Sequence, residues 1–568
     1  MRSSPRVVDF IVAFLQRQEV RHLFGVGGAN IEDLYDALYH APGGPLGVVA
    51  KHEFSAATMA DGYHRAGQRI PVLATTSGAG AMNLVPGLAE LRASYVPALA
   101  LIGQPPAALD GHGSFQETSG LAGSIDAIRL FDEIAVYCAR ADKPESIAEL
   151  LPRAWAAATD PVAPGPAVLL LPKDVQQAVL PTGQPPARMH PRKSILSRAA
   201  ERAQAVALLR KAGPGGAVVI AGEGVARADA RTELARVAAA LGAGVAVAPD
   251  AKDVVAASSP HLLGILGAIG PERVLEAVER ASLVMLVGTR LPQMTGAALR
   301  NRLKGTPVIS VDPRPPFLTD RGEMVQLTGP LAEELDRLAA EFPEPPSAPA
   351  PAAAPPAPPD SSAPLNMRAA ALVVSAALPE GATVVSDAGN AGASVIHHVD
   401  VPAGGRFIAA MGMAGMGHSF GAGIGAAFAT GRPACVLAGD GAFFMHGMEV
   451  HTAIEHRLPV TFVVLNNNAH GMCYTREQLF FSGEYSYNLF HPARIGEGAA
   501  ALFPGLSAVT VRTVGDLRTA LSRAFTARRP ALVCVNVDPA EMPPFQPFFQ
   551  HLKAERHGLP VIQGVVPG

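Results

Sequence analysis

One segment of the chain, residues 434 to 467, restricts the possible folds more than any other. The apolar run Ala434–Ala438 predicts a short buried strand that ends in the turn Gly439-Asp440-Gly441. After a helix-like segment, a second apolar run, Val460–Leu465, leads into Asn466-Asn467. This order predicts a β–turn–α–β unit with two parallel strands. Open α/β sheets bind ligands beyond the carboxyl ends of their strands, so we expect a ligand site at Asp440 and Asn467.

The residue types at this predicted edge suit a diphosphate that is held through a hard cation. Gly439 and Gly441 allow the backbone to approach a phosphate closely, and the start of the following helix favours an anion. The Asp440 carboxylate and the Asn467 amide supply the oxygen ligands that a hard cation prefers, with phosphates and water completing the shell. Two unrelated turns are the alternative interpretation, since Gly-Asp-Gly alone is a common turn sequence.

The Gly-Asp-Gly turn, followed by a double Asn whose second residue lies 27 positions after Asp440, resembles the magnesium–diphosphate motif of thiamine diphosphate enzymes. The resemblance implies that Asp440, Asn467 and the backbone of Ala469 bind Mg²⁺. It also implies that Gly439 and Gly441 contact the cofactor. The segment Ser386–Ala391 resembles the first diphosphate-contacting turn of the family, with Gly389 and Asn390 as contacts. An Asx turn is the alternative interpretation of that segment.

A second part of the resemblance concerns the rings of the cofactor. Residues 48–67 begin as a strand and enter a helix at Lys51-His52-Glu53, where Glu53 stands in the place of the glutamate that protonates the aminopyrimidine ring. We therefore expect Glu53 to be buried; the alternative is an ordinary acid at a helix start. Met416 matches the residue that wedges between the two cofactor rings, the alternative being a core methionine. The Ala414 carbonyl would hold the exocyclic amine, and Met472 would also contact the cofactor.

The segments Thr75–Gln104 and Ser114–Thr118 resemble the acetolactate synthase branch of the family. In that branch the residues matched by Phe115 and Gln116 line the reaction pocket, so Gln116 is a candidate donor to a substrate oxygen. His112 is a candidate proton donor; a solvated loop histidine is the alternative. His470 is a candidate acid–base group or a packed, hydrogen-bonded histidine.

Two segments depart from the acetolactate synthase pattern. Arg476 stands where the branch carries the Trp that selects the acceptor, and its guanidinium suits a carboxylate or phosphate. A salt bridge with Glu477 or Glu484 is the alternative role. The middle segment Gly288–Gly296 retains Arg290 but lacks the Asp-Asp-Arg of the branch. Because FAD contacts overlap that segment in the family, FAD is not expected, and neither is a role in branched-chain amino-acid synthesis.

Apolar runs and turns alternate in three blocks along the chain, which predicts α/β architecture with three doubly wound parallel-sheet domains. The expected parts are a pyrimidine-binding domain (1–185), a central domain (195–342), a Pro/Ala-rich linker (343–364) and a diphosphate-binding domain (365–568). The expected strands are 22–26, 46–50, 71–76, 97–103, 166–172, 216–224, 242–249, 282–289, 307–312, 382–387, 406–410, 434–438, 460–465 and 531–537.

Composition excludes several classes of partner. With 49% hydrophobic residues and a net charge of −3, the 568-residue chain gives no sign of a nucleic-acid or membrane surface. Cys138, Cys435, Cys473 and Cys534 show no metal spacing, which indicates packing residues in a reducing cytoplasm. The first residues predict an amphipathic helix rather than a signal peptide.

The resemblance as a whole implies a thiamine diphosphate- and Mg-dependent carboligase. Such an enzyme decarboxylates a 2-oxo acid, with pyruvate as the expected donor, and transfers the acyl unit to a second carbonyl. A 2-oxo acid decarboxylase or acyloin lyase is the alternative activity, and a non-catalytic partner subunit is the alternative of another class. The resemblance further implies a homodimer or homotetramer with shared active sites, in which Glu53 meets the partner subunit's Asp440 and Asn467.

Overall fold

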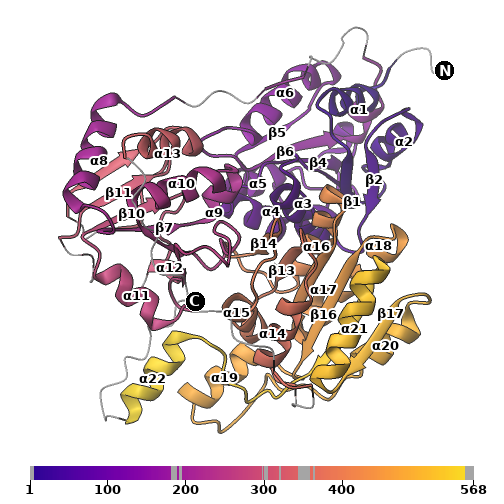
Figure 1. Ribbon diagram of the computed structural model, residues 1–568. Coiled ribbons are helices and arrows are strands. Elements are labelled where there is room, and N and C mark those ends of the chain that lie inside the picture. The colour runs from indigo at the N-terminus through magenta and orange to yellow at the C-terminus, as the bar shows by residue number, and fades with distance from the viewer. Residues whose placement is uncertain are drawn as a thin grey trace. The chain divides into compact units, whose positions relative to one another are not determined.

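The computed structural model describes residues 5–180, 188–190, 195–296, 299, 303, 305–318, 322–342, 359–361 and 365–556. These residues form three six-stranded sheets whose paired strands run parallel, which confirms the expected α/β class (Figure 1). The predicted linker 343–364 lies outside the described residues, except for 359–361.

The N-terminal sheet has the order β2-β1-β3-β4-β6-β5, the central sheet β12-β11-β10-β7-β8-β9 and the C-terminal sheet β14-β13-β15-β16-β18-β17. The strands of the three sheets are β1 (His22–Val26), β2 (Leu46–Val49), β3 (Val72–Thr75), β4 (Ala98–Gln104), β5 (Tyr137–Arg140), β6 (Pro166–Pro172), β7 (Ala217–Ala221), β8 (Gly244–Val247), β9 (Leu262–Ile265), β10 (Leu283–Val287), β11 (Val308–Val311), β12 (Met324–Leu327), β13 (Thr383–Ser386), β14 (Arg406–Ala409), β15 (Ala434–Gly439), β16 (Val460–Asn466), β17 (Ser507–Val511) and β18 (Ala531–Asn536).

Helices connect most of these strands, as parallel pairing requires. The α-helices are α1 (Val7–Arg17), α2 (Glu32–His40), α3 (Glu53–Gly67), α4 (Ala79–Ala93), α5 (Ala127–Ile134), α6 (Ile147–Ala158), α7 (Lys173–Gln177), α8 (Ala199–Ala212), α9 (Glu223–Arg227), α10 (Arg231–Leu241), α11 (Glu272–Glu279), α12 (Gln293–Gly296), α13 (Leu331–Ala339), α14 (Met367–Ala377), α15 (Gly389–His398), α16 (His418–Thr430), α17 (Asp440–His446), α18 (Val450–Glu455), α19 (Gly471–Phe480), α20 (Ile495–Leu502), α21 (Val514–Ala527) and α22 (Gln546–Arg556).

The chain divides into two compact units, each described here by itself. The first holds the residues up to 193 together with 410–434 and 442–460, and the second holds 194–409, 435–441 and the residues from 461 on. The first unit therefore combines the N-terminal sheet with α16 and α18 from the C-terminal part of the sequence. The predicted domain boundaries, drawn from composition, stay a prediction.

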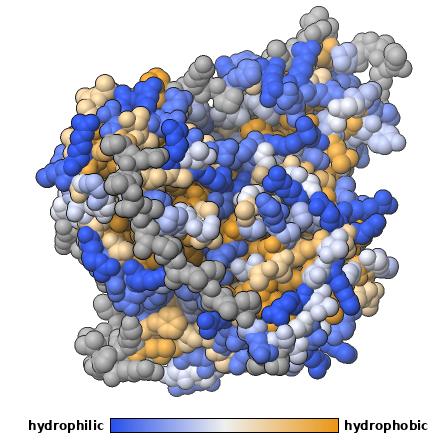
Figure 2. Space-filling model, viewed as in Figure 1, coloured by the Kyte–Doolittle hydropathy of each residue, from blue (hydrophilic) through white to orange (hydrophobic). Residues whose placement is uncertain are grey.

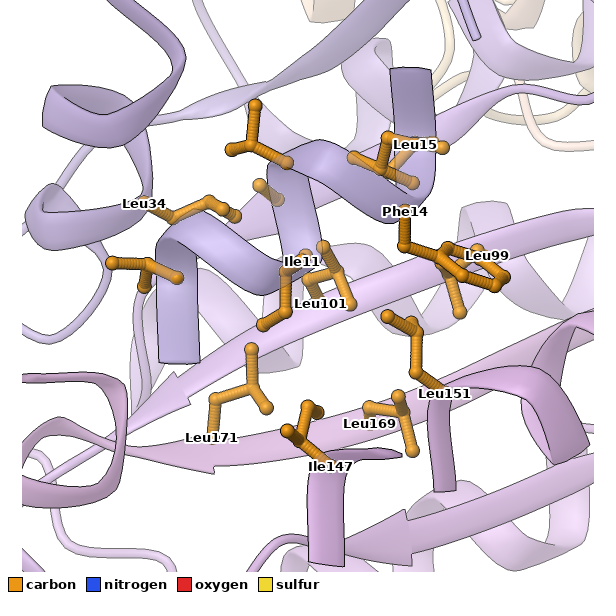
Figure 3. Packing of buried hydrophobic residues seen from close by; sticks show 14 of the residues in the cluster. Ile11, Phe14, Leu15, Leu34, Leu99, Leu101, Ile147, Leu151, Leu169 and Leu171 are labelled. Carbon is orange, nitrogen blue, oxygen red and sulfur yellow. The ribbon is translucent and has the colours of Figure 1, made fainter. Parts of the chain in front are cut away.

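The core of the first unit lies between the N-terminal sheet and the helices α1 and α6. Alternate residues of a strand point to the same face, so Leu99 and Leu101 of β4 and Leu169 and Leu171 of β6 present one apolar surface. Side chains of α1 and α6, among them Phe14 and Leu151, cover that surface (Figure 3). Because helices cover both faces of a parallel sheet, the sequences of its central strands are continuous runs of apolar residues.

A second contact within the first unit joins α3 to α16 at very short range. A Cβ added at Gly62 of α3 would lie 1.9 Å from the Ala422 carbonyl oxygen, and one added at Gly425 of α16 would lie 1.9 Å from the Met59 carbonyl oxygen. A Cβ added at Gly421 of α16 would lie 2.0 Å from the Thr58 hydroxyl oxygen. The glycines of α16 therefore bring the two helix backbones together, and any larger side chain at these positions would push them apart.

In the second unit, a buried charge cluster links the central sheet region to β14. The Arg406 guanidinium pairs with Asp253 and, at 2.8 Å, with Glu223. The neighbouring Lys252 ammonium donates to the carbonyl oxygens of Ile396 and Val399 at the carboxyl end of α15. A cation at a helix C-terminus compensates the unpaired carbonyl groups there.

All of the strands predicted from sequence are present, but four others were missed. These are β5, β9, β12 and β17, and each lies at the edge of its sheet. In each of them at least half of the residues are partly or fully exposed. An edge strand has only one neighbour and less cover, so these four lack the continuous apolar run by which other strands were predicted.

Figure 2 shows a mostly hydrophilic face with apolar patches between the polar residues. No helix in the described part of the chain is long and apolar enough to cross a membrane. The cysteine prediction was partly wrong: Cys435 and Cys534 are buried, but Cys473 is exposed on α19. Helical geometry turns Cys473 outward while Thr475, two residues later, is buried.

Removing the Phe14 ring tests the packing of α1. Its ring meets the edge of Trp155, the only tryptophan of the chain, with centroids 5.8 Å apart. Phe14→Ala should lower the free energy of unfolding by about 3–5 kcal/mol, since it leaves a cavity in a close-packed core. The urea midpoint of Trp155 fluorescence measures this. The control, Tyr39→Ala, changes a residue that is 87% exposed and should shift stability by less than about 0.5 kcal/mol. Equal midpoints for the two variants would contradict the assigned core.

Candidate active site

Three neighbouring strands of the C-terminal sheet end beside the predicted cofactor residues. β13, β15 and β16 are adjacent in the sheet and end at Ser386, Gly439 and Asn466. Shortly after these ends, α15 begins at Gly389, α17 at Asp440 and α19 at Gly471. Parallel strands bring their carboxyl ends to one edge, so the starts of α15 and α19 direct backbone N–H groups toward that edge. This is the arrangement expected of a site for an anionic group.

Asp440 and Asn467 lie together, as predicted. The backbone N–H of Ala469 donates to Asp440 Oδ2 at 3.0 Å and to Asn467 Oδ1 at 3.1 Å, so both oxygens face one point of the loop. A Cβ added at Gly471 would lie 2.7 Å from Asn467 Nδ2, which explains why this loop position is a glycine. The backbone of Ala469 is thus part of the same cluster of polar groups.

The Asn390 side chain reaches from the start of α15 to α19. Its Nδ2 donates to the Thr475 hydroxyl, 2.9 Å away. Thr475 in turn donates to the Gly471 carbonyl oxygen, which ties the start of α19 to the start of α15. The Asx turn stays the alternative interpretation of the segment Ser386–Ala391. Sequence reasoning missed Thr475, because a threonine inside a helix carries no distinctive signal.

The residues present fit a cation and a diphosphate. Asp440 is only 1% exposed, and burial raises the pKa of its carboxyl group to about 6 although backbone N–H groups oppose this shift, so the ionised form is only partly compensated. The buried Asn390 Oδ1 has no hydrogen-bond partner in the described part of the protein. Gly389 has φ +82°, and a Cβ added there would meet nothing within 4 Å. Buried acceptor oxygens beside open space are what a Mg²⁺–diphosphate group requires.

The donor set also limits which metal chemistry is possible. Among the described residues, no group of three or more His, Cys, Asp or Glu side chains could hold a metal ion. A cation at Asp440 would therefore depend on one carboxylate, on neutral oxygens of Asn467 and Ala469, and on oxygens of a bound phosphate. Mg²⁺ is commonly bound in this way, through few protein ligands together with substrate phosphates.

Glu53 is the first residue of α3 and is buried, as predicted. Asn83 Nδ2 donates to its Oε2 at 2.9 Å, and a Cβ added at Gly80 would lie 3.1 Å from Oε1. The His52 imidazole caps the helix by accepting from the Phe54 N–H, so Glu53 is not the capping group. A buried carboxylate with one amide partner is suited to holding a proton at a bound ring.

The segment between β14 and α16 carries the other two predicted ring contacts. Ala414 is exposed and has φ +53°, the left-handed region that favours glycine, and Met416 is half-buried. An alanine in that region is strained by steric contact between its Cβ and the backbone, so the surrounding structure must hold it there. The roles of Ala414 and Met416 stay predictions.

The loop at residues 112–116, which resembles the acetolactate synthase branch, has more exposed side chains than the site at Asp440. Gln116 has φ +62°, and its Oε1 accepts from the Thr76 hydroxyl at 3.4 Å. Phe115 is 81% exposed within this chain, and His112 is exposed with its Nδ1 beside the Asp110 carbonyl oxygen. His112 thus has the environment of the solvated alternative, and its role as proton donor stays a prediction.

Glu117 organises this loop; the sequence matched it to the acetolactate synthase branch but predicted no role for it. Its carboxylate accepts from the backbone N–H groups of Gly111, Gly113 and Ser114 and from the Ser119 hydroxyl. The Ser119 hydrogen bond and these backbone donors lower the pKa of the Glu117 carboxyl group. The Ser-x-x-Glu spacing in residues 114–117 was the available signal, although it is normally associated with helix starts.

Arg476 and His470 occupy the first turns of α19 and the loop before it. Arg476 is half-buried and makes no hydrogen bond or ion pair with the described residues. The expected alternative partner Glu477 accepts instead from Ser486 and Asn488. The His470 ring packs edge-on against Phe490, with centroids 4.6 Å apart, which favours the packed interpretation of His470. Met472, at the start of α19, is half-buried.

The candidate residues fall into the two compact units. The first unit contains Glu53, His112, Phe115, Gln116, Ala414 and Met416, and the second contains Gly389, Asn390, Gly439, Asp440, Gly441, Asn467, Ala469, His470, Met472 and Arg476. In the central domain, Arg290 stacks on the Phe317 ring at 4.0 Å and donates to the Pro315 carbonyl oxygen. The Arg290 guanidinium is thus engaged within its own loop region.

Replacing the Asp440 carboxylate by an amide tests the cation site. Asp440→Asn should weaken the Mg²⁺-dependent binding of thiamine diphosphate on the order of tenfold or more. Removing a direct ligand should lower the affinity for the cation at least as much as removing a residue that only hydrogen-bonds to a ligand. Isothermal titration calorimetry measures the dissociation constant. The control Asp312→Asn changes another buried carboxylate, which pairs with Arg314 in the central domain. If both variants bind thiamine diphosphate as the wild type does, the cation site is wrongly placed.

Comparison with known proteins identifies full-length relatives. The chain is 27% identical to the "Probable acetolactate synthase large subunit" of Methanocaldococcus jannaschii, over 95% of this chain and 93% of that protein. It is 28% identical to the "Acetolactate synthase isozyme 2 large subunit" of Escherichia coli, over 94% and 96%. The solved 4-hydroxybenzoylformate decarboxylase of Rhodococcus jostii shares the fold, with a TM-score of 0.81 at 20% identity over 94% of this chain and 99% of that one.

Family profiles match the three parts of the chain in order. The profile described as "Thiamine pyrophosphate enzyme, N-terminal TPP binding domain" matches residues 5–123, the central domain profile matches 202–338, and the C-terminal TPP binding domain profile matches 387–535. The two TPP binding profiles cover Glu53, Asp440 and Asn467, the residues on which the resemblance was based. The chain belongs to the thiamine pyrophosphate enzyme family.

Proposed function

We propose that this protein is a thiamine diphosphate- and Mg-dependent carboligase of the acetolactate synthase type. It decarboxylates a 2-oxo acid, with pyruvate as donor, and transfers the acyl unit to a second carbonyl compound. The observation that carries the proposal is the convergence of Asp440, Asn467 and the Ala469 N–H at the carboxyl ends of β15 and β16. Relatives that match nearly the whole chain and are named acetolactate synthase support the choice of reaction.

Each candidate residue then has a defined task. Asp440, Asn467 and the Ala469 carbonyl hold Mg²⁺, while the glycines at 389, 439 and 441 admit the diphosphate. Bound thiamine diphosphate supplies the electron sink for decarboxylation. Glu53 holds a proton at the aminopyrimidine ring, and its burial keeps water from competing for that proton. Gln116 orients the oxygen of the substrate through its side-chain amide.

A 2-oxo acid decarboxylase or an acyloin lyase is the second candidate function. The solved benzoylformate decarboxylases of Rhodococcus jostii and Polynucleobacter necessarius share the fold with a TM-score of 0.81, but at 20% identity this likeness concerns the fold alone. A non-catalytic subunit is disfavoured, because Glu53, Asp440 and Asn467 are all present.

The protein is proposed to act as a homodimer or homotetramer. Three large side chains shortly after Asp440, those of Phe444, Met445 and Met448, are each about half exposed in the single chain. Exposed apolar side chains close together in sequence are typical of a surface that a partner covers.

The first test combines product analysis with Glu53→Gln. Purified protein with thiamine diphosphate, Mg²⁺ and pyruvate, supplied with a panel of aldehydes and 2-oxo acids, should give a ligated product that mass spectrometry identifies. Glu53→Gln should lower kcat by about a hundredfold to ten-thousandfold, since the amide cannot exchange a proton with the ring. Carbon dioxide and free aldehyde without a ligated product would instead establish the decarboxylase.

A matched control separates this role from the helix-dipole alternative. Glu32 is, like Glu53, the acidic first residue of a helix, but it is exposed. Glu32→Gln should leave kcat unchanged. If Glu53→Gln has no larger effect than Glu32→Gln, Glu53 is only a helix-start acid.

The second test concerns the acceptor. Arg476 has no partner among the described residues, so its guanidinium is available to an acidic acceptor. Arg476→Met should raise KM by about tenfold to a hundredfold for acceptors that carry a carboxylate, the loss expected for a charged hydrogen bond, and should leave uncharged aldehydes unaffected. A uniform change across charged and uncharged acceptors would contradict the assignment.

A further inference from the structure

One buried carboxylate outside the candidate site binds the backbone of the segment that carries Ala414. Glu90, on α4, is 3% exposed. Its Oε2 accepts from the Met413 N–H at 2.5 Å and from the Ala414 N–H at 3.0 Å, and its Oε1 accepts from the Gly412 N–H at 3.2 Å. Three successive backbone donors therefore converge on a single side chain. Hydrogen bonds from backbone groups to an ionised carboxylate are among the stronger ones in proteins.

The segment itself needs such a constraint. Residues 412 to 414 are exposed, and Ala414 has the strained left-handed φ of +53°. Solvated loops with few apolar contacts open easily unless hydrogen bonds hold them. A Cβ added at Gly412 would lie 2.4 Å from the Ala93 Cβ and 3.1 Å from Glu90 Oε1, so the segment also rests directly on α4.

Glu90 is in turn contacted by Ser94, which directly follows α4, and by Arg65 of α3. Ser94 donates to its Oε1 at 2.7 Å, and Arg65 Nη2 of α3 lies 3.8 Å from the same oxygen. Arg65 Nε also donates to Asp61 at 2.9 Å, and the second oxygen of Asp61 lies 2.8 Å from His418 Nε2 of α16. All four charged side chains of this chain of contacts are buried.

Positive and negative groups alternate along this series. Their mutual attraction offsets part of the free-energy cost of burying each charge. Although burial opposes it, the contacts with Arg65 and His418 lower the pKa of the Asp61 carboxyl group to about 2. The contact with Asp61 raises the pKa of His418 against the effect of its burial. With Asp61 ionised, its carboxylate offsets the neighbouring cations, while the Glu90 oxygens accept from the backbone.

We propose that Glu90 is a positioning residue for the cofactor: it fixes the backbone at Gly412–Ala414 and thereby the direction of the Ala414 carbonyl and the place of Met416. The inference rests on the proposed function, because Ala414 and Met416 matter through their contacts with thiamine diphosphate. Since Arg65 and Asp61 lie on the same helix as Glu53, α3 positions both Glu53 and, through Glu90, the segment at Ala414.

The test begins with the cofactor-free protein. Glu90→Gln keeps the size of the side chain and one acceptor oxygen but removes the charge. Hydrogen–deuterium exchange of a peptide covering residues 410–417 should accelerate on the order of tenfold, the effect of losing a charge-assisted hydrogen bond. The control Glu334→Gln alters a fully buried carboxylate of the central domain that accepts from the Ser197 N–H. It should leave the exchange of residues 410–417 unchanged.

The second readout separates positioning from a merely structural role. At saturating thiamine diphosphate, and per bound cofactor, kcat of Glu90→Gln should fall on the order of a hundredfold, as misplacement of a reacting group by about 1 Å does. KM for the 2-oxo acid should stay the same. If Glu90→Gln does not fold, as Trp155 fluorescence would show, Ser94→Ala removes one support of Glu90 without altering charge and should give a smaller acceleration of exchange.

Unchanged exchange at residues 410–417 in Glu90→Gln, or in Ser94→Ala where that variant is used, would overturn the proposal. Faster exchange with unaltered kcat would also overturn it, because Glu90 would then only stabilise the segment. A wild type that binds no thiamine diphosphate would instead refute the proposed function, and with it the cofactor-related part of this inference.

Discussion

The close approach of α3 and α16 is the contact on which the arrangement of the first unit depends. Glycines at 62, 421 and 425 let the two backbones come within a distance that no Cβ would allow. Contacts advance in the same direction along both helices, from Phe54 beside Gly415 to Gly67 beside Ala429. A tightly packed helix pair has little freedom to slide, so Glu53 at the start of α3 is placed as rigidly as the pair itself.

The candidate cation site has the opposite character, since its polar groups are incompletely compensated. A buried carboxylate whose pKa is raised to about 6 by burial contributes less stability when ionised than when neutral. The contribution of Asp440 to stability is therefore present below its unfolded pKa and is lost as the pH rises through about 6. A bound cation reverses this balance because it stabilises the ionised form. The proposed cation would therefore stabilise a group that the fold of the second unit leaves only partly compensated at the ends of β15 and β16.

The two networks of buried charge differ in what they do. His418, Asp61, Arg65 and Glu90 contact one another in that order, and the Glu90 oxygens also accept from the backbone of residues 412 to 414. Arg406, Asp253 and Glu223 join β14 to the central sheet region. Neither network contains a predicted catalytic residue, but the first binds the segment that carries the proposed cofactor contact at Ala414. Rigid support of this kind is what precise placement of a cofactor requires.

The sequence by itself predicted the central strands and the proximity of Asp440 and Asn467, because both residues follow continuous apolar runs of the length and composition typical of buried parallel strands. The resemblance to thiamine diphosphate enzymes further predicted a buried Glu53, because the matched glutamate shares a proton with the cofactor ring. The edge strands β5, β9, β12 and β17 were missed, since partial exposure removes the apolar run. Only the tertiary structure revealed that Asn390 reaches Thr475 and that Glu90 binds residues 412 to 414, more than 300 positions away. Contacts of a side chain with distant backbone N–H groups leave no trace in local sequence, because every residue except proline carries the same donor.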